Sequence, residues 1–167
     1  FSSPSSLTKI EGGTFERCKK LKEITIPSSV TSIGHHSFNK CYLLSKIEIP
    51  ESVTKIELGA FGHCESIEKI LLPSSVTSIE HHCFYKCTLL KEIVISSSIT
   101  TISKFSFAGC TSLENVSIPS TVISIESYSF YNCLSLLQIS IPSSVTLIGS
   151  HAFGSCKSLT KIEIPSN

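Results

Sequence analysis

One cysteine returns every 23 residues along the chain, and this spacing restricts the fold more than any other feature of the sequence. The seven positions are Cys18, Cys41, Cys64, Cys87, Cys110, Cys133 and Cys156. Apolar columns recur with the same period, and their members in one unit are Leu21, Ile24, Ile26, Ile33 and Phe38. A fixed period of roughly 20 to 50 residues is the signature of a repeat architecture. The sequence therefore predicts a solenoid of about seven coils, one per 23 residues.

Each coil contains the pattern of two short extended segments and a turn. In residues 21–26, isoleucines alternate with polar residues, which is typical of a strand with one buried face. Pro27 ends this strand, because proline cannot donate a hydrogen bond to a ladder. Residues 30–33 predict a second extended segment, and the apolar spacing in residues 37–44 predicts one 3₁₀ or helical turn.

A single coil cannot bury its own apolar residues, so successive coils must stack as parallel strands about 4.8 Å apart. We expect one domain over residues 1–167, with a parallel β-sheet on one face and short extended segments and 3₁₀ or helical turns on the other. Neither Phe1 nor Asn167 provides a polar cap, so the uncapped end coils predict neighbouring repeats, end-to-end self-association or fraying. The missing initiator methionine predicts an interior fragment of a longer protein.

The repeat unit LxxIxIPxSVTxIGxxAFxxCxS resembles the 23-residue leucine-rich repeat of the BspA-like, or Treponema pallidum-type, class, and the resemblance covers essentially the whole chain. Ordinary leucine-rich repeats carry Asn or Cys where this chain has hydroxyl residues such as Ser29, and we expect these hydroxyls to bond the turn backbone. The resemblance implies a leucine-rich-repeat solenoid in a bacterial or protist surface protein that adheres to host matrix and to other cells. It also implies a cell-surface or secreted location, with a cytoplasmic location as the alternative.

Composition excludes several classes of function. The chain has no Asp, so mechanisms that need aspartate dyads, Ser-His-Asp triads or EF-hand loops are excluded. A net charge of +1 argues against nucleic acid as a partner. No run approaches the ~20 apolar residues of a membrane helix, so this segment is not expected to insert directly into a membrane.

Cysteine and histidine are the remaining chemical candidates. Adjacent coils place cysteines within disulfide range, but an odd ladder cannot pair completely, and we expect small buried side chains. The pairs His35–His36 and His81–His82 are expected on a solvated surface, since neither a CxxC motif nor converging ligands indicate a metal site. A Cys-His nucleophile is the only enzymatic alternative, with His63–Cys64 as the closest pair in sequence. We expect no catalytic residue, cofactor or metal.

The outward side chains of the predicted sheet form the candidate binding face. Leu71 and Val94 stand out because the other outward positions are polar, and an apolar pair rimmed by charges is typical of a contact centre. The candidate residues are Glu23, Lys46, Glu48, Lys69, Leu71, Glu92, Val94, Asn115, Gln138, Lys161 and Glu163. Asn115 also begins an N-glycosylation sequon, Asn-Val-Ser.

These observations predict a non-catalytic repeat module that binds a protein or glycoprotein on the sheet face, within an adhesin-like surface protein. Two alternatives remain open at this point. One is an intracellular scaffold that holds signalling partners together, and the other is a structural spacer without a ligand. A glycan on Asn115 would favour the exported protein, whereas loss of function on changing Leu71 and Val94 would exclude the spacer.

Overall fold

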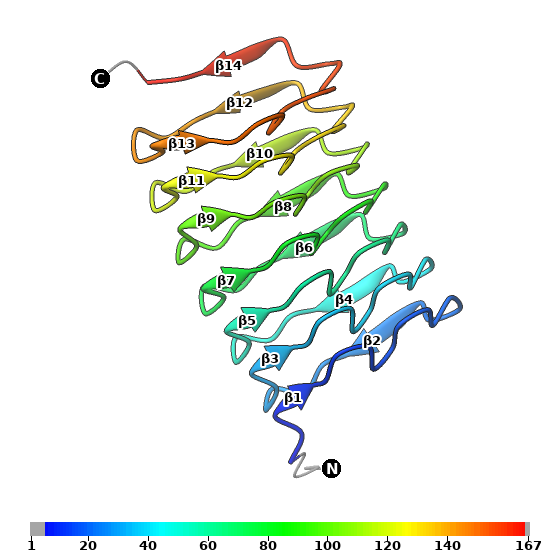
Figure 1. Ribbon diagram of the computed structural model, residues 1–167. Coiled ribbons are helices and arrows are strands. Elements are labelled where there is room, and N and C mark those ends of the chain that lie inside the picture. Colours follow the sequence, from blue (N-terminus) through cyan, green and yellow to red (C-terminus); the bar gives the residue numbers. More distant parts are fainter. Residues whose placement is uncertain (1–5, 166–167) are drawn as a thin grey trace.

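The computed structural model describes residues 6–165. The chain forms a stack of flat coils in which each strand lies beside the equivalent strand of the next coil (Figure 1). Every coil contributes one long strand and one short strand. The long strands are β2 (Glu23–Thr25), β4 (Lys46–Glu48), β6 (Lys69–Leu71), β8 (Glu92–Val94), β10 (Asn115–Ser117), β12 (Gln138–Ser140) and β14 (Lys161–Glu163). The short strands are β1 (Lys9–Ile10), β3 (Ser32–Ile33), β5 (Lys55–Ile56), β7 (Ser78–Ile79), β9 (Thr101–Ile102), β11 (Ser124–Ile125) and β13 (Leu147–Ile148).

All strand pairs are parallel, and their register equals the sequence repeat. Ile70 of β6 lies opposite Ile93 of β8, and Ile33 of β3 lies opposite Ile56 of β5, 23 residues apart in each case. The period read from the sequence is therefore confirmed as the period of the coil. Phe1 and Asn167, the two expected uncapped ends, lie outside the described residues.

The long-strand sheet is divided at two seams. Strands β6, β8 and β10 form a central three-stranded sheet, and the pairs β2–β4 and β12–β14 flank it. Within residues 6–165, no ladder pairing joins β4 to β6 or β10 to β12, although these strands are neighbours in the stack. We call these two places the seams.

The core consists of the repeated apolar columns. The aliphatic columns of the inner coils are buried, and the phenylalanine column forms a continuous stack from Phe15 to Phe153. Neighbouring rings in this stack have centroids 5.3 to 5.5 Å apart and nearly parallel planes. Because each inner ring contacts the rings of the coils before and after it, the column connects every coil to its neighbours.

The segment after each short strand differs from the expected 3₁₀ or helical turn, since no helix occurs in the described part of the chain. In the second coil, the amides of Ser37 and Asn39 bond back three residues, whereas the intervening amide of Phe38 donates to Ala60 of the following coil. Positive φ values at His36 and Lys40, 51° and 62°, interrupt any helical run. Alternate amides of this segment thus donate hydrogen bonds to the following coil and do not continue a helix.

Three side-chain ladders connect adjacent coils through the backbone. The hydroxyls at the turn slot bond the preceding coil, as Ser52 Oγ does to Val30 O at 2.6 Å, so this expectation is confirmed. The buried thiols also donate across coils, with Cys87 Sγ 3.3 Å from Phe61 O. A glutamate ladder was not anticipated: Glu80 Oε2 accepts the amide of Leu58 at 3.0 Å. Each ladder satisfies a polar group that stacking would otherwise bury unpaired.

The coil that contains β13 and β14 leaves its apolar columns partly uncovered. Ile148, Ile162 and Ile164 are 40%, 45% and 66% exposed, whereas the equivalent residues of the inner coils are mostly buried. Among residues 6–165 there is no helix of the length and apolar character needed to cross a membrane.

Candidate functional site

The structure places the candidate binding residues on one surface, which we call the sheet face. Strands of three residues expose their first and third side chains and turn the central isoleucine or valine inward, as the burial pattern of β6 and β8 shows. All of the predicted residues belong to these exposed positions. They are Glu23, Lys46, Glu48, Lys69, Leu71, Glu92, Val94, Asn115, Gln138, Lys161 and Glu163.

Charges on the sheet face are paired between or within strands. Lys69 Nζ lies 3.0 Å from Glu92 Oε2 in the neighbouring strand, and Lys161 Nζ lies 2.6 Å from Glu163 Oε1. The hydrogen bond from Lys161 lowers the pKa of the Glu163 carboxyl from its usual value. Since positive and negative groups are mixed along the face and most of them pair, the face carries no field of one sign that would recruit a polyanion.

Leu71 and Val94 lie directly opposite each other in the register of β6 and β8. Their side chains are 57% and 46% exposed, and the Lys69–Glu92 ion pair lies at the other end of the same two strands. This part of the sheet face therefore has an apolar centre, formed by the cross-strand pair, and a charged rim, formed by the ion pair.

A shallow hollow of about 550 Å³ lies at the seam between β4 and β6, next to the apolar centre. Leu71 borders this hollow, and Val94 borders a second one of about 440 Å³ on the side of β10. The lining of the first hollow is Ile47, Glu48, Ile49, Glu51, Lys69, Leu71, Leu72, Pro73 and Ser74. The apolar pair therefore forms a ridge with a depression on either side.

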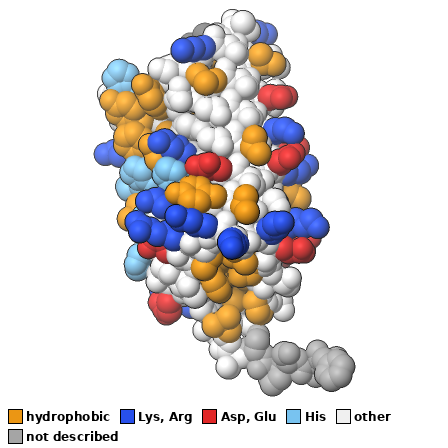
Figure 2. All heavy atoms as spheres, turned by 90° about the vertical axis from the view of Figure 1, so that its right-hand side faces the viewer, with side chains coloured by type: hydrophobic (Ala, Val, Ile, Leu, Met, Phe, Trp, Pro, Cys, Tyr) orange, Lys and Arg blue, Asp and Glu red, His pale blue; other side chains and the backbone are white. Residues whose placement is uncertain are grey.

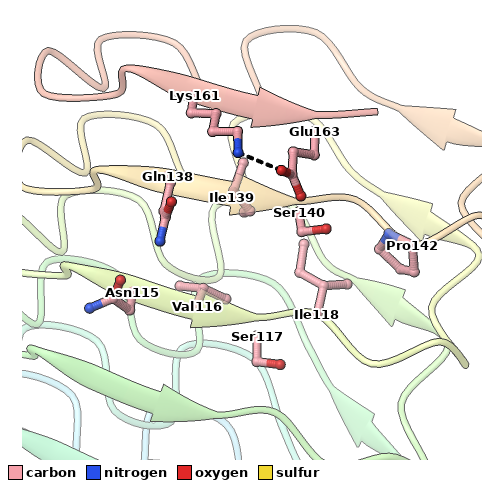
Figure 3. Close-up of a pocket in the computed structure, with 10 residues that line it drawn as sticks. All are labelled: Asn115, Val116, Ser117, Ile118, Gln138, Ile139, Ser140, Pro142, Lys161 and Glu163. Carbon is pink, nitrogen blue, oxygen red and sulfur yellow. Dashed lines mark ion pairs between the residues drawn. The ribbon is translucent and has the colours of Figure 1, made fainter. Parts of the chain in front are cut away.

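A further hollow of about 400 Å³ covers β10, β12 and β14 at the second seam (Figure 3). Asn115 and Gln138 point to one end of it, Ile118 and Pro142 lie at the other, and the Lys161–Glu163 ion pair closes its upper side. Sequence reasoning missed Ile118 and Pro142 as surface contributors. The period is unbroken at this seam, so the sequence carried no signal of the opening.

Asn115, the glycosylation candidate, is exposed on β10 and borders this hollow. A glycan attached there would cover the second seam and the strand next to Val94. Glycosylation and protein binding would therefore compete for the same part of the sheet face.

The buried cysteines of the inner coils lack the environment of a catalytic thiolate. All eight are free, and those of the inner coils are buried. Burial raises the pKa of the Cys41 thiol to about 11 and that of Cys110 to about 12. Cys64, the partner in the His63–Cys64 pair, likewise has its pKa raised by burial. A thiol held protonated in a packed interior is a structural side chain rather than a nucleophile.

The histidines differ from the expected solvated row. His35 and His81 are exposed, but His36, His63 and His82 are half-buried against other rings and backbone. Burial lowers the pKa of His82, and the neighbouring His81 and His36 lower it further. Within residues 6–165, no group of three or more His, Cys, Asp or Glu residues is arranged to hold a metal ion.

Comparisons with solved structures give the same architecture. The leucine-rich repeat protein of T. pallidum has a TM-score of 0.88 and 30% identity, over 92% of this chain and 72% of its own. A leucine-rich repeat protein of Eubacterium ventriosum has a TM-score of 0.68 and 29% identity, over 90% of this chain and 45% of its own. A leucine-rich cell surface protein of Faecalibacterium prausnitzii has a TM-score of 0.54 and 26% identity, over 96% of this chain and 64% of its own.

This chain thus spans less than two thirds of the Eubacterium and Faecalibacterium proteins. A search of curated proteins gives no match. The family model for the BspA-type leucine-rich repeat region matches residues 1–103 and 77–167, in six copies. With the 23-residue coil, the parallel sheet and this match in agreement, the chain belongs to the BspA-type leucine-rich repeat family.

Proposed function

We propose that this chain is a non-catalytic protein-binding module of a cell-surface, adhesin-like protein, and that a protein or glycoprotein binds on its sheet face. The family is one of repeat scaffolds, and one structural neighbour is described as a leucine-rich cell surface protein. A stack of coils presents an extended surface without a deep pocket, which suits a macromolecular ligand better than a small substrate.

The observation that carries this proposal is the Leu71–Val94 pair. Both side chains are about half exposed, they lie opposite each other in register, and hollows flank them on both sides. Binding energy at protein interfaces concentrates in a few desolvated residues within a polar rim. Lys69, Glu92 and Glu48 provide that rim around the apolar pair.

The test compares the intact chain with a Leu71→Ser, Val94→Ser double variant for binding to a panel of purified matrix glycoproteins. A matched control carries Leu89→Ser and Ile123→Ser, because these side chains are 46% and 52% exposed and lie outside the sheet face. Both variants must retain the circular dichroism of the intact chain. We expect a ligand that binds the intact chain and the control but binds the sheet-face variant at least about tenfold more weakly.

Three other binding results would each favour a different interpretation of this chain. Equal binding by all three chains would move the contact away from the sheet face. Absence of binding to the matrix panel, together with capture of a defined cytoplasmic signalling protein through Leu71 and Val94, would favour the intracellular scaffold. If neither class binds, the structural spacer becomes the better description.

A further inference from the structure

A second row of side chains lies on the outside of the turn segments, and we call it the outer ladder. Its members are His36, Gly59, His82, Phe105, Tyr128 and His151. From His82 to His151 the rings stack on one another, with successive centroids 4.8, 4.8 and 4.9 Å apart. Figure 2 looks onto this side of the molecule, where histidine and hydrophobic side chains gather along the left-hand edge.

Gly13 occupies the equivalent position in the first coil, and between His36 and His151 the outer ladder lacks one ring, at Gly59. Phe105 and Tyr128 have both faces covered by neighbouring rings, but His82 has a stacked ring only on the side of Phe105 among the described residues. On the other side of the missing ring, His36 leans over Gly59, whose added Cβ would lie 2.5 Å from His36 Nδ1. This nitrogen is buried and has no hydrogen-bond partner in residues 6–165. A polar atom of this kind calls for a partner.

The missing ring leaves a hollow of about 220 Å³. Its lining is His36, Asn39, Lys40, Gly59, Gly62, His63, His82 and Tyr85. Gly62 removes a second side chain from the same coil, so this coil is recessed at both outer positions. Drug-sized ligands occupy about 300 to 1,000 Å³. The hollow therefore has room for a single ring rather than a larger ligand, and aromatic rings stack at the centroid spacing that the ladder already shows.

The charged side chain that lines the hollow is a lysine, and the neutral Asn39 turns its Oδ1 toward Gly62. Lys40 and His63 line it, and Lys86 lies over the ring of Tyr85 with Nζ 5.4 Å from the centroid. The lining residues include no carboxylate. Besides burial, the positive charges of Lys86 and Lys40 lower the pKa of His63, whereas Glu65, whose carboxylate lies 3.8 Å from His63 Nδ1, raises it. Because Lys40 lines the hollow and Glu65 does not, a negatively charged group is favoured beside Lys40.

We propose that the hollow over Gly59 binds one planar aromatic ring that carries an anionic group, with the ring between His36 and His82 and the anion against Lys40. The ring would continue the stack that ends at His82. This site is separate from the sheet face and does not depend on what binds there. The ligand is either a free aromatic carboxylate or an aromatic residue beside an acidic residue in a partner protein.

The test follows the histidine ring signals of the intact chain by ¹H–¹³C NMR at about pH 7, where ring-current shifts report stacking. The probes are 4-hydroxyphenylacetate for the free acid and N-acetyl-Glu-Tyr-amide for the protein residue. Cyclohexylacetate has the same charge but no planar ring, and it serves as the negative probe. We expect saturable upfield shifts at His82 and His36 with half-saturation on the order of 1 mM, and no saturable shift at His151.

Two variants check the geometry. Gly59→Phe places a ring at the empty position. The backbone accepts it, because the ladder residues with φ of 51° to 59° include Phe105 at the same slot, and the His36 side chain must rotate away from the added Cβ. We expect it to abolish probe binding. Lys40→Gln removes the cation and should weaken binding about two- to fivefold, whereas Lys19→Gln, a matched change on the exposed Lys19, should leave binding unchanged.

Comparison of the two aromatic probes also distinguishes a free aromatic acid from an aromatic residue of a partner protein. Saturation at a lower concentration of 4-hydroxyphenylacetate assigns a free aromatic acid, and tighter binding of the dipeptide assigns a partner protein. If neither aromatic probe gives saturable shifts at His82, or if cyclohexylacetate binds equally well, the proposal is wrong. Unchanged binding by a folded Gly59→Phe chain would overturn it as well.

Discussion

The ring of Phe84 stacks on the ring of Phe61 with 5.5 Å between centroids and an angle of 5° between planes. On its other side, Phe84 stacks on Phe107 at the same separation. Phe15, in the first coil, is half-buried, and of the described phenylalanine rings only Phe38 stacks on it. Position along the column, rather than residue type, should therefore decide how much each ring stabilises the fold.

Replacing Phe84 with alanine should lower the free energy of unfolding by about 3–5 kcal/mol, because a fully buried ring is lost from between two neighbours. Phe15→Ala should cost only about 1–2 kcal/mol, since that ring is half-buried and stacked on one side. Urea unfolding followed by circular dichroism measures both. Equal losses would contradict a nearest-neighbour description of the stack.

Glu80 predicts an acid-sensitive contribution to stability. Lys55 Nζ lies 2.7 Å from Glu80 Oε1, and its hydrogen bond lowers the pKa of the Glu80 carboxyl. The hydrogen bond that the backbone amide of Leu58 donates to Glu80 Oε2 lowers this pKa further. A pKa lowered by folding stabilises the protein above the ordinary carboxyl pKa of 4.5, and this stabilisation is lost as the pH falls through the lowered value.

Glu80→Gln should therefore reduce the free energy of unfolding by about 0.5–1 kcal/mol near neutral pH, since the side chain is partly exposed. At a pH well below 4.5, the variant and the intact chain should have the same stability. Urea titrations at both pH values test this. Glu23→Gln is a suitable control, because its 3.9 Å contact with Lys46 is longer and more exposed. A difference that persists in acid would contradict the linkage.

Much of the fold could be predicted because its determinants repeat with the sequence. Ile70 and Ile93, equivalent residues of adjacent units, lie opposite each other in neighbouring strands, and Cys87 is a buried thiol in a ladder as expected. The exposure of Leu71 and Val94 was predictable for the same reason, since alternation in a strand decides which side chains point outward.

The remainder depends on atoms that a sequence period does not specify. The helical turn after Ile33 was not found, because alternate amides donate to the next coil and His36 adopts a positive φ. The half-buried position of His82 follows from stacking on Phe105, which depends on how side chains of different coils lie over one another. The seams beside β4 and β12 likewise leave the repeat unbroken and have no sequence signal.

Thiol labelling should distinguish the first coil from the interior. Cys18 is exposed, whereas Cys41, Cys64 and Cys87 are buried. In the native protein, a colorimetric disulfide reagent should modify Cys18 at least about 100-fold faster than these buried thiols, because their reaction requires local opening of the stack. All eight should react in denaturant. A buried cysteine that reacted faster than Cys18 would contradict this assignment and would support a Cys-dependent enzyme instead.

The coil of β13 and β14 predicts self-association of the 167-residue chain. Ile162 and Ile164 are 45% and 66% exposed on and beside β14, and among the described residues this strand pairs with β12 on one side only. Stacking the first coil of one chain on the last coil of another would bury these side chains and continue the sheet. An Ile162→Lys, Ile164→Lys variant should remain monomeric at concentrations where the intact chain associates, as measured by sedimentation velocity. Ile123→Lys places the same charge on a 52% exposed isoleucine away from the end coil and should associate like the intact chain. An intact chain that stays monomeric at every accessible concentration would exclude end-to-end contact.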